Sequence, residues 1–244
     1  MKHLLALLTA LCLLASGMGM TQAQDKSPLG ISFYVLRVIY PQDEKQGVTL
    51  TAYNNSAEPY LMQSWLRPVD PTTGDVDLNW QGTPVMPFIV TPPLARLEAK
   101  GELALRIRRN DMPLPSDRES VFFISLKALP VQQPAAQQMV MTVVSNIKLF
   151  YRPTGLAKRA VEDMAPKLTF QQQGNQLTAS NPTPYWLTFS RLAVGKVALG
   201  KPALRLMVPP FGKQSYTLPT SASGKVTWQM IDEDGWDTPV AQQD

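Results

Sequence analysis

The side chains that most often carry catalysis or hold metals are almost absent from this chain of 244 residues. It has one cysteine, Cys12, and one histidine, His3, and both fall in an N-terminal segment that we expect to be removed. The remaining chain then has no thiol and no imidazole. This excludes Ser–His–Asp and Cys–His catalysis, zinc sites built on those ligands, and haem ligation through either residue. Only carboxylate, Lys, Tyr or Ser chemistry is left to an enzyme.

Two groups of carboxylates are the candidates for that chemistry. Asp117 and Glu119 stand two residues apart on a predicted strand, so they share a face and could form the acid–base pair of a hydrolase. Arg118 lies between them and favours a structural ion pair instead. The acidic run at 232–234 precedes Gly235, but it lacks the spaced oxygen ligands of a calcium loop and is more simply a solvated turn. We therefore predict no metal and no cofactor.

Two cations lie inside apolar stretches of the sequence. Arg37 is the centre of VLRVI at 35–39, and Lys148 is the centre of IKL at 147–149. A long cation in such a place more often snorkels at a strand edge than binds a ligand. The other basic residues are scattered, and loss of Lys2 leaves 22 Lys and Arg against 19 Asp and Glu. This charge favours ordinary solubility, and no basic groove with stacking aromatics indicates nucleic-acid binding.

The stretch at 139–153, MVMTVVSNIKLFYRP, predicts an alternating strand with two apolar faces. One face presents Met139, Met141, Val143, Ser145 and Ile147. A strand with an apolar outer face is either buried between two layers or open to a partner. Packing beneath the polar loop at 129–138 would satisfy the first alternative. Strict alternation places Lys148 on the opposite face, unless a bulge intervenes.

Residues 1–23 have the pattern of a secretory signal peptide. A short positive start is followed by an apolar core at 4–15 and a small-residue cleavage site at 21–23. Cys12 lies inside that core after a leucine, where a lipoprotein signal would have a small residue. No later segment has about 18 uninterrupted apolar residues. We expect a soluble exported protein without disulfides and without stable membrane insertion.

Strand and turn signals recur at short intervals, among 22 prolines, and long helical periodicity is missing. The first half predicts a number of strands typical of an immunoglobulin-like sandwich, at 31–40, 48–54, 60–67, 88–91, 102–108, 120–126 and 139–151. A charged connector at 156–166 precedes a second set, with a hairpin turn at Gly174-Asn175. The second set comprises 167–171, 176–180, 185–192, 203–208, 214–218 and 225–231. The sequence therefore predicts an all-β protein with two tandem immunoglobulin-like β-sandwich domains, at 24–154 and 155–244.

Segments in both halves resemble, in the right order, the signature of the periplasmic chaperones of the chaperone–usher pilus pathway. They are LRVIYP (36–41), YLMQSW (60–65), PFIVTPPLARLE (87–98), DRESVFFISLKALP (117–130), IKLFYRP (147–153), NPTPYWLT (181–188) and IDEDG (231–235). Each alone is a weak motif, but the match extends over most of the chain. The short loop before 139 resembles the short-loop subclass of this family. The resemblance implies two domains set at an angle with a cleft between them, and no enzymatic activity.

The resemblance also implies partners. Chaperones of this family bind pilus subunits, both pilins and a tip adhesin, in the periplasm and deliver them to an outer-membrane usher. A subunit lacks its last strand, and the face from Met139 to Ile147 would fill that groove by strand addition. Arg37 and Lys148 match the pair that anchors the C-terminal carboxylate of the subunit. The alternative function is a secreted structural or adhesin module, although no donor extension or disulfide of a pilus subunit is visible.

A buried ionic group between the domains is implied as well. Glu119 and Arg152 match two of its members. The third is an Asp in the family, and here that position is Glu233, with Asp232 as a possible substitute. The segment at 91–93, Thr-Pro-Pro, resembles one that contains a cis proline in the family, which the sequence alone does not establish.

Overall fold

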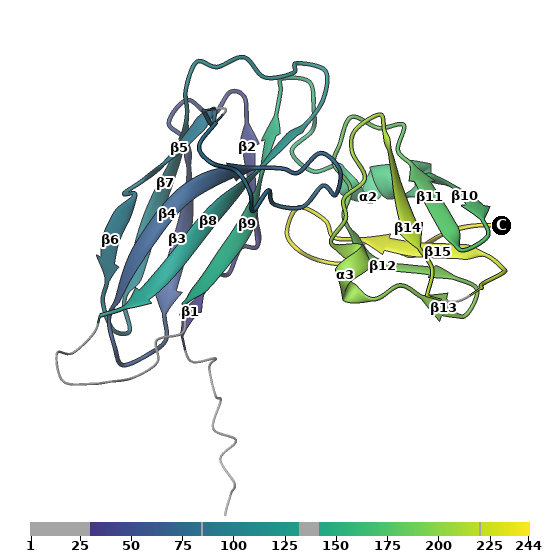
Figure 1. Ribbon diagram of the computed structural model, residues 1–244. Helices are drawn as coiled ribbons and strands as arrows, with labels where there is room; N and C mark the ends of the chain where they lie inside the picture. Colours follow the sequence, from purple (N-terminus) through teal and green to yellow (C-terminus); the bar gives the residue numbers. More distant parts are fainter. Residues whose placement is uncertain (1–29, 84, 132–141, 220) are drawn as a thin grey trace, which may run out of the picture.

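The computed structural model describes residues 30–83, 85–131, 142–219 and 221–244. It contains two β-sandwich domains in succession, the first in purple to teal and the second in green to yellow in Figure 1. The predicted fold class, all-β with two tandem immunoglobulin-like sandwiches, is confirmed. The predicted signal peptide at 1–23 lies outside the described residues.

The first domain packs a four-stranded sheet, in the order β1-β3-β7-β5, against a five-stranded sheet, in the order β2-β9-β8-β4-β6. Its strands are β1 (Ile31–Ser32), β2 (Arg37–Pro41), β3 (Val48–Asn54), β4 (Tyr60–Pro68), β5 (Phe88–Thr91), β6 (Leu94–Leu97), β7 (Glu102–Arg109), β8 (Ser120–Pro130) and β9 (Val143–Arg152). The pairs are antiparallel except β2 with β9, which run parallel. Because side chains alternate along a strand, every second one enters the core, as Leu50, Ile124 and Leu149 do.

Two stretches of this domain change sheet, which the sequence pattern does not predict. The pattern at 31–40 predicts one strand, but the chain forms β1 in one sheet and β2 in the other, with 33–36 between them. β5 and β6 likewise join different sheets, on either side of a cis Thr91–Pro92 peptide bond. Alternation does not record which sheet a strand joins, because both sheets bury every second side chain.

Strand β8 is longer than predicted, and β9 is described over only part of its predicted range. β8 continues through Leu129 and Pro130, which were expected in the following loop. Of the strand predicted from Met139, the structure describes the part from Val143 onward as β9. Met139 and Met141 lie outside the described residues.

The second domain packs a three-stranded sheet, in the order β10-β11-β14, against a four-stranded sheet, in the order β13-β12-β15-β16. Its elements are α2 (Val161–Met164), the 3-10 helix η2 (Ala165–Lys167), β10 (Thr169–Gln173), β11 (Gln176–Ser180), β12 (Phe189–Val194), β13 (Val197–Ala198), α3 (Lys201–Leu204), β14 (Lys213–Thr217), β15 (Val226–Met230) and β16 (Ala241–Gln243). Aromatic rings from both sheets meet in its core. The ring centroids of Trp228 and Phe170 lie 4.6 Å apart, and those of Tyr216 and Phe189 lie 5.5 Å apart.

Two predictions for this domain were wrong. The pattern at 203–208 predicts a strand, but helix α3 overlaps its start, and Val208 makes an isolated bridge with Leu187. Pro202 in the first turn of α3 favours a helix start, because its missing N–H has no helical partner at that position. The connector at 156–166, expected to be irregular, contains α2 and the beginning of η2.

One buried amide shapes the loop that leads into β12. Asn181 Nδ2 donates to the backbone oxygens of Tyr185 (2.7 Å) and Pro209 (3.0 Å), and its Oδ1 accepts from the backbone N–H and the hydroxyl of Thr183 (2.9 and 2.7 Å). A buried amide is stable only when its polar atoms are satisfied. These bonds account for the asparagine and threonine of the NPTPYW segment, and they fix the loop that places Trp186 beside the first domain.

Candidate functional site

Strand β9 is paired on both sides over only part of its length. It pairs with β8 from Val143 to Tyr151, with no shift in register. It pairs with β2 only from Lys148 to Arg152. Among the described residues, 143–147 therefore have no strand on the side opposite β8. Unpaired backbone groups on such an edge can accept another strand.

The predicted donor residues that the structure describes differ in their exposure. Val143 is 62 % exposed, whereas Ile147 is buried in the core of the first domain at 3 %. Ser145 lies between them on the same face, and with Val143 it borders a cavity of about 260 Å³ that is lined by side chains from β1, β4 and β8. Met139 and Met141 lie outside the described residues. Of the described donor residues, Val143 is thus the one that a partner could bury.

Lys148 lies on the other face of β9, as strict alternation predicts. The constant register with β8 excludes a bulge between Val143 and Lys148, so this second face is the one that meets the second domain. Phe150 follows on the same face and belongs to a buried cluster with Met207 of the second domain. One strand thus carries the predicted donor residues on one face and meets the second domain with the other.

Arg37 and Lys148 are direct neighbours across the β2–β9 ladder. The Arg37 guanidinium is buried, lies 5.4 Å from the centroid of the Phe150 ring, and donates to the Ile231 carbonyl oxygen of the second domain at 2.7 Å. The half-buried Lys148 donates from Nζ to Thr188 Oγ1 over a long 3.4 Å. It forms no ion pair with a carboxylate in the described part of the chain. The two cations therefore lie at the interdomain face rather than snorkelling at an outer edge.

The electrostatics of this pair favour an anionic ligand. Removal from water lowers the pKa of Arg37 to about 10 and the pKa of Lys148 to about 7. The positive charge of Arg37 lowers the pKa of Lys148 further, whereas Glu119 and Glu233 raise the pKa of Arg37. A carboxylate bound here would favour the charged forms of both residues. Each charge-assisted hydrogen bond would contribute about 1.5–3 kcal/mol.

Glu119, Arg152 and Glu233 meet in a buried ionic group between the domains. Arg152 Nε lies 2.6 Å from Glu119 Oε1, and Arg152 Nη2 lies 2.7 Å from Glu233 Oε1. Glu119 Oε2 accepts from the backbone N–H of Trp186 at 2.8 Å. Burial raises the pKa of Glu119, and the guanidinium of Arg152 opposes that rise. The group connects the residue before β8 and strand β9 of the first domain with the turn after β15 of the second.

The acidic residue that joins Arg152 is Glu233 and not Asp232. Glu233 Oε1 also accepts from two backbone N–H groups at the start of α2, at 3.0 and 3.3 Å. Asp232 Oδ1 instead accepts from two N–H groups of its own turn, at 2.9 and 2.8 Å. Asp234, expected in a solvated turn, forms an exposed ion pair with Arg159 at 2.6 Å.

The carboxylate pair considered for hydrolysis does not form a shared site. Asp117 is exposed and bonded to Arg118 at 2.7 Å, whereas Glu119 is buried against Arg152. The two carboxylates therefore lie in different surroundings, and both are held by cations. An acid–base pair needs two carboxyl groups that face one substrate with different proton affinities.

Two hydrogen-bonding partners in this site were not predicted from the sequence. They are the backbone N–H of Trp186, which binds Glu119, and the hydroxyl of Thr188, which contacts Lys148. Both belong to the NPTPYWLT segment at 181–188, which marks the region in the sequence but not the contacts. A backbone donor leaves no signal in residue type, so only the fold could identify it.

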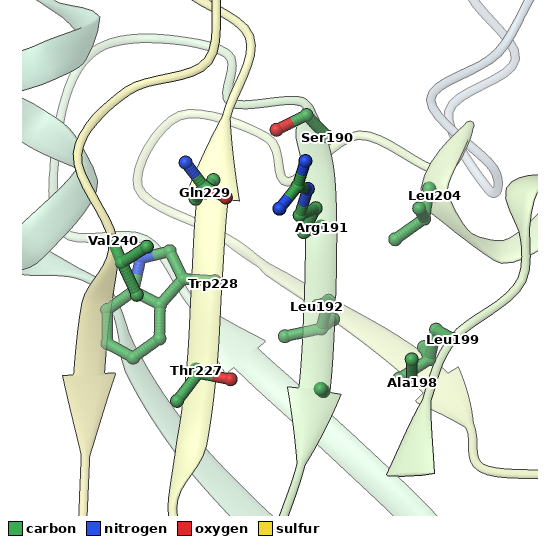
Figure 2. A pocket seen from close by; sticks show the side chains of 11 residues that line it. Ser190, Arg191, Leu192, Ala198, Leu199, Leu204, Thr227, Trp228, Gln229 and Val240 are labelled. Carbon is green, nitrogen blue, oxygen red and sulfur yellow. The ribbon is translucent and has the colours of Figure 1, made fainter. Parts of the chain in front are cut away.

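A cavity of about 340 Å³ lies on β12 and β15 of the second domain (Figure 2). Leu192, Leu204 and Trp228 are among the side chains around it. Its charged lining residue, Arg191, forms an ion pair with Asp237 at 3.8 Å. The lining of this cavity is thus mainly apolar, and its cation already has a partner. The buried charged residues lie between the two domains, so we place the candidate site there and not in this cavity.

Comparison with known proteins identifies the family to which these features belong. Residues 30–157 match the model of the pili and flagellar-assembly chaperone, PapD N-terminal domain, and residues 163–242 match that of the pili assembly chaperone PapD, C-terminal domain. The chaperone protein FimC of Escherichia coli K12 is 35 % identical over 235 residues, which cover 93 % of this chain and 90 % of FimC.

Solved structures give the same result. In the structure of the Salmonella enterica SafA pilin with the SafB chaperone, the matched chain is 29 % identical with a TM-score of 0.74, covering 89 % of this chain and 97 % of that one. The E. coli chaperone DraB is 33 % identical with a TM-score of 0.72, covering 88 % and 98 %. The two family models and the relatives agree, and the chain belongs to the PapD family of pili assembly chaperones.

Proposed function

We propose that this protein is a periplasmic chaperone that binds, folds and caps pilus subunits by donor-strand complementation and delivers them to an outer-membrane usher. The observation that carries the proposal is the free edge of β9 at 143–147, which leads directly to the Arg37–Lys148 pair. An unpaired edge is a liability in an ordinary exported protein, and it has a use when another chain supplies the next strand. Similar proteins are named chaperone protein FimC and SafB chaperone, and SafB was solved with the pilin SafA.

Strand addition at this edge would combine backbone bonds with apolar burial. The subunit strand would pair with the free edge, and Val143, together with Met139 and Met141 if the predicted alternation continues, would enter the groove of the subunit. Each large apolar side chain buried there contributes about 1.5–3 kcal/mol before ordering costs. Methionine repacks easily, which suits a face that accepts several related grooves. Ile147 belongs to the core of the chaperone itself and so marks the end of the lent face.

The start of β2 would set the register of the added strand. β2 occupies the edge of β9 from Lys148 onward, so a subunit strand that runs parallel to β9 must end there. A chain that ends at this point presents its terminal carboxylate to the desolvated Arg37–Lys148 pair. By binding this carboxylate, the pair would fix the position of the C-terminus of the subunit and thereby the register of the added strand.

The pilus class and the compartment are inferred from the sequence. The short loop predicted before β9 favours the short-loop subclass, whose members serve composite pili with a tip adhesin. The signal-peptide pattern at 1–23 favours export to the periplasm. Within the described residues, no helix is both long enough and apolar enough to cross a membrane.

A secreted structural or adhesin module is the alternative function. Two tandem sandwiches would suit it equally well. It would not account for two desolvated cations at an interdomain face, one of which has no carboxylate partner among the described residues. The names of the relatives also favour the chaperone.

The donor face can be tested with two variants of the same residue type. Val143 and Val144 are neighbours on opposite faces of β9 and are 62 % and 41 % exposed. Val143→Asp should abolish copurification with a coexpressed pilus subunit, because a charge would enter an apolar groove. Val144→Asp should retain most of the complex. Circular dichroism of both variants checks the fold, and equal losses, or none, would exclude donation by this face.

The anchor is tested separately. Arg37→Ala and Lys148→Ala should each yield a folded chaperone that no longer copurifies with the subunit, because the terminal carboxylate loses a cationic donor. A Lys148→Ala protein that still supports full pilus assembly would refute the anchor.

A further inference from the structure

A loop of the first domain, residues 69–77, reaches the second domain and is called the strap here. Figure 1 shows this dark blue loop after β4 extending to the second domain. The strap is closed on itself by a bridge between Val69 and Val76 and by a bond from the Gly74 N–H to the Asp70 oxygen at 2.7 Å. Gly74 has φ +67°, a backbone conformation that favours glycine. The strap is therefore an ordered turn that crosses between the domains.

The tip of the strap is fastened to the second domain by two kinds of contact. A Cβ at Gly74 would lie 3.0 Å from backbone atoms of Met207, a tight contact that glycine avoids. Val69 and Val76 pack against the buried cluster that contains Met207. Asp75 Oδ2 lies 3.4 Å from Arg205 Nε, also in the second domain. Apolar packing and one ion pair thus hold Asp75 at the interdomain face.

The strap lies beside the face of β9 that carries Lys148. Val69 and Val76 of the strap pack against the buried cluster that contains Phe150, which shares that face with Lys148. The charged groups around Lys148 are Arg37 on β2, Asp75 on the strap and Arg205 after α3. Removal from water is the main cause that lowers the pKa of Lys148 to about 7; the two arginines lower it further, and Asp75 raises it.

The other acids near this face act elsewhere. Glu119 and Glu233 are bonded to Arg152, and Asp232 holds its own turn. These three acids act on Arg37. Among the described residues, Asp75 is thus the carboxylate that acts on Lys148.

We propose that Asp75 is a positioning residue of the carboxylate anchor, a counter-charge that the strap holds near Lys148 while Lys148 stays available to a ligand. The inference rests on the proposed function, in which the Arg37–Lys148 pair binds the C-terminal carboxylate of an extended peptide. Asp75 acts through Lys148 and need not touch the ligand. It is bonded to Arg205, so it does not neutralise Lys148 outright.

The arrangement couples carboxylate binding to proton uptake. Because the pKa of Lys148 is lowered to about 7, its proton is lost around neutral pH, and a bound carboxylate favours its charged form. Affinity for a carboxylate should therefore fall by about tenfold between pH 6 and pH 8, since the protonated fraction of the free protein falls by that factor. Removal of a nearby negative charge should move this decline to lower pH, and removal of a nearby positive charge should move it to higher pH.

Two variants test the proposal because they predict opposite shifts. The probe is a synthetic peptide with the C-terminal sequence of a copurified pilus subunit, titrated calorimetrically against the full chaperone from pH 5.5 to pH 8.5. Asp75→Asn should move the midpoint of the decline down by about 0.5–1 pH unit, and Arg205→Gln should move it up. The affinity ratio of Asp75→Asn to the natural protein should accordingly fall about three- to tenfold across this range. Asp77→Asn, on the same strap, should leave the midpoint unchanged.

The outcomes separate this inference from the proposed function. If Asp75 and Arg205 only tie the domains together, both variants change affinity by the same factor at every pH, and the inference is overturned. A midpoint that does not move in either variant overturns it as well. The peptide with an amidated C-terminus should lose the pH dependence. If Lys148→Ala binds the free-acid peptide as tightly as the natural protein, the anchor itself is wrong, which is a different result.

Discussion

Arg152 should be the member of the interdomain ionic group whose loss harms stability most. It is the cation between two buried carboxylates, at 2.6 Å from Glu119 and 2.7 Å from Glu233. Its Nη1 also donates to the backbone oxygens of Ala157 and Lys158. Arg152→Met keeps a long apolar stem but leaves both carboxylates without a cation of their own. Breaking a buried pair from one side typically costs about 3–5 kcal/mol, and here two pairs break.

Glu119→Ala should be the milder change, because Arg152 keeps Glu233. It removes one charge-assisted bond, worth about 1.5–3 kcal/mol, and leaves the Trp186 N–H without its acceptor, which costs about 1–3 kcal/mol. We expect a total of roughly 4 kcal/mol for Glu119→Ala. Arg152→Met should exceed it by about 1.5–3 kcal/mol, the value of the further charge-assisted bond to Glu233.

The pH dependence of Arg152→Met follows from the same geometry. Burial already raises the pKa of Glu119, and the variant removes the cation that opposes this rise. A carboxyl group with a folded-state pKa above its unfolded value binds protons better in the folded protein. Stability then falls as the pH rises from about 4.3 through the raised pKa. Acidification from pH 7 to pH 5 should therefore reduce the deficit of Arg152→Met, by up to about 1.4 kcal/mol per pH unit.

Urea unfolding, followed by tryptophan fluorescence and far-UV circular dichroism at pH 5, 6 and 7, measures these differences. Arg118→Met is the matched control, because Arg118 forms an ion pair of similar length, 2.7 Å, in an exposed place. It should change stability little. If Glu119→Ala proves more destabilising than Arg152→Met, or if the deficit of Arg152→Met does not depend on pH, the reasoning is wrong.

Two further predictions concern the stability of the protein without a bound subunit. The pKa of Lys148, about 7, lies below its unfolded value, so its charge opposes folding below pH 7, and this cost fades as the pH rises toward about 10.4. Lys148→Met should accordingly raise the free energy of unfolding by roughly 2–4 kcal/mol at pH 6 and far less near pH 10, and equal gains at both pH values would contradict it. Gly195 and Gly174 have similar φ values, +56° and +59°, but only at Gly195 would a Cβ collide, 2.3 Å from the Ser223 oxygen. Gly174→Ala should cost about 1–2 kcal/mol by thermal unfolding and Gly195→Ala clearly more, and equal costs would show that the Ser223 segment gives way.

Much of the fold could be predicted from the sequence because its strands bury alternate side chains. The pattern at 48–54, for instance, predicts β3 with its bounds, and Leu50 and Ala52 enter the core as that pattern requires. The hairpin at Gly174-Asn175 also follows from local chemistry, since glycine permits the positive φ of that turn. Such features are local, so neighbouring residues determine them.

Features that depend on distant segments could not be predicted in this way. The strand pattern at 203–208 fails because Pro202 starts a helix in a segment whose place is set by packing against β12. The choice of Glu233 over Asp232 depends on which side chain the turn aims at Arg152. Asp75 lies in a polar loop that no pattern marks, and only its approach to the second domain gives it significance. In each case the deciding contact joins parts of the chain that are far apart in sequence.

The register between β2 and β9 determines two features of the site together. Because the first residue of β2 is Arg37 and its partner is Lys148, the two cations must stand side by side at the point where the parallel ladder begins. For the same reason, 143–147 have no neighbour from β2, and no other described strand pairs with them on that side. A shift of β2 by two residues toward the start of β9 would cover part of the open edge and separate Arg37 from Lys148. One pairing therefore fixes both the length of edge that a partner strand can occupy and the position of the charges that would meet its terminus.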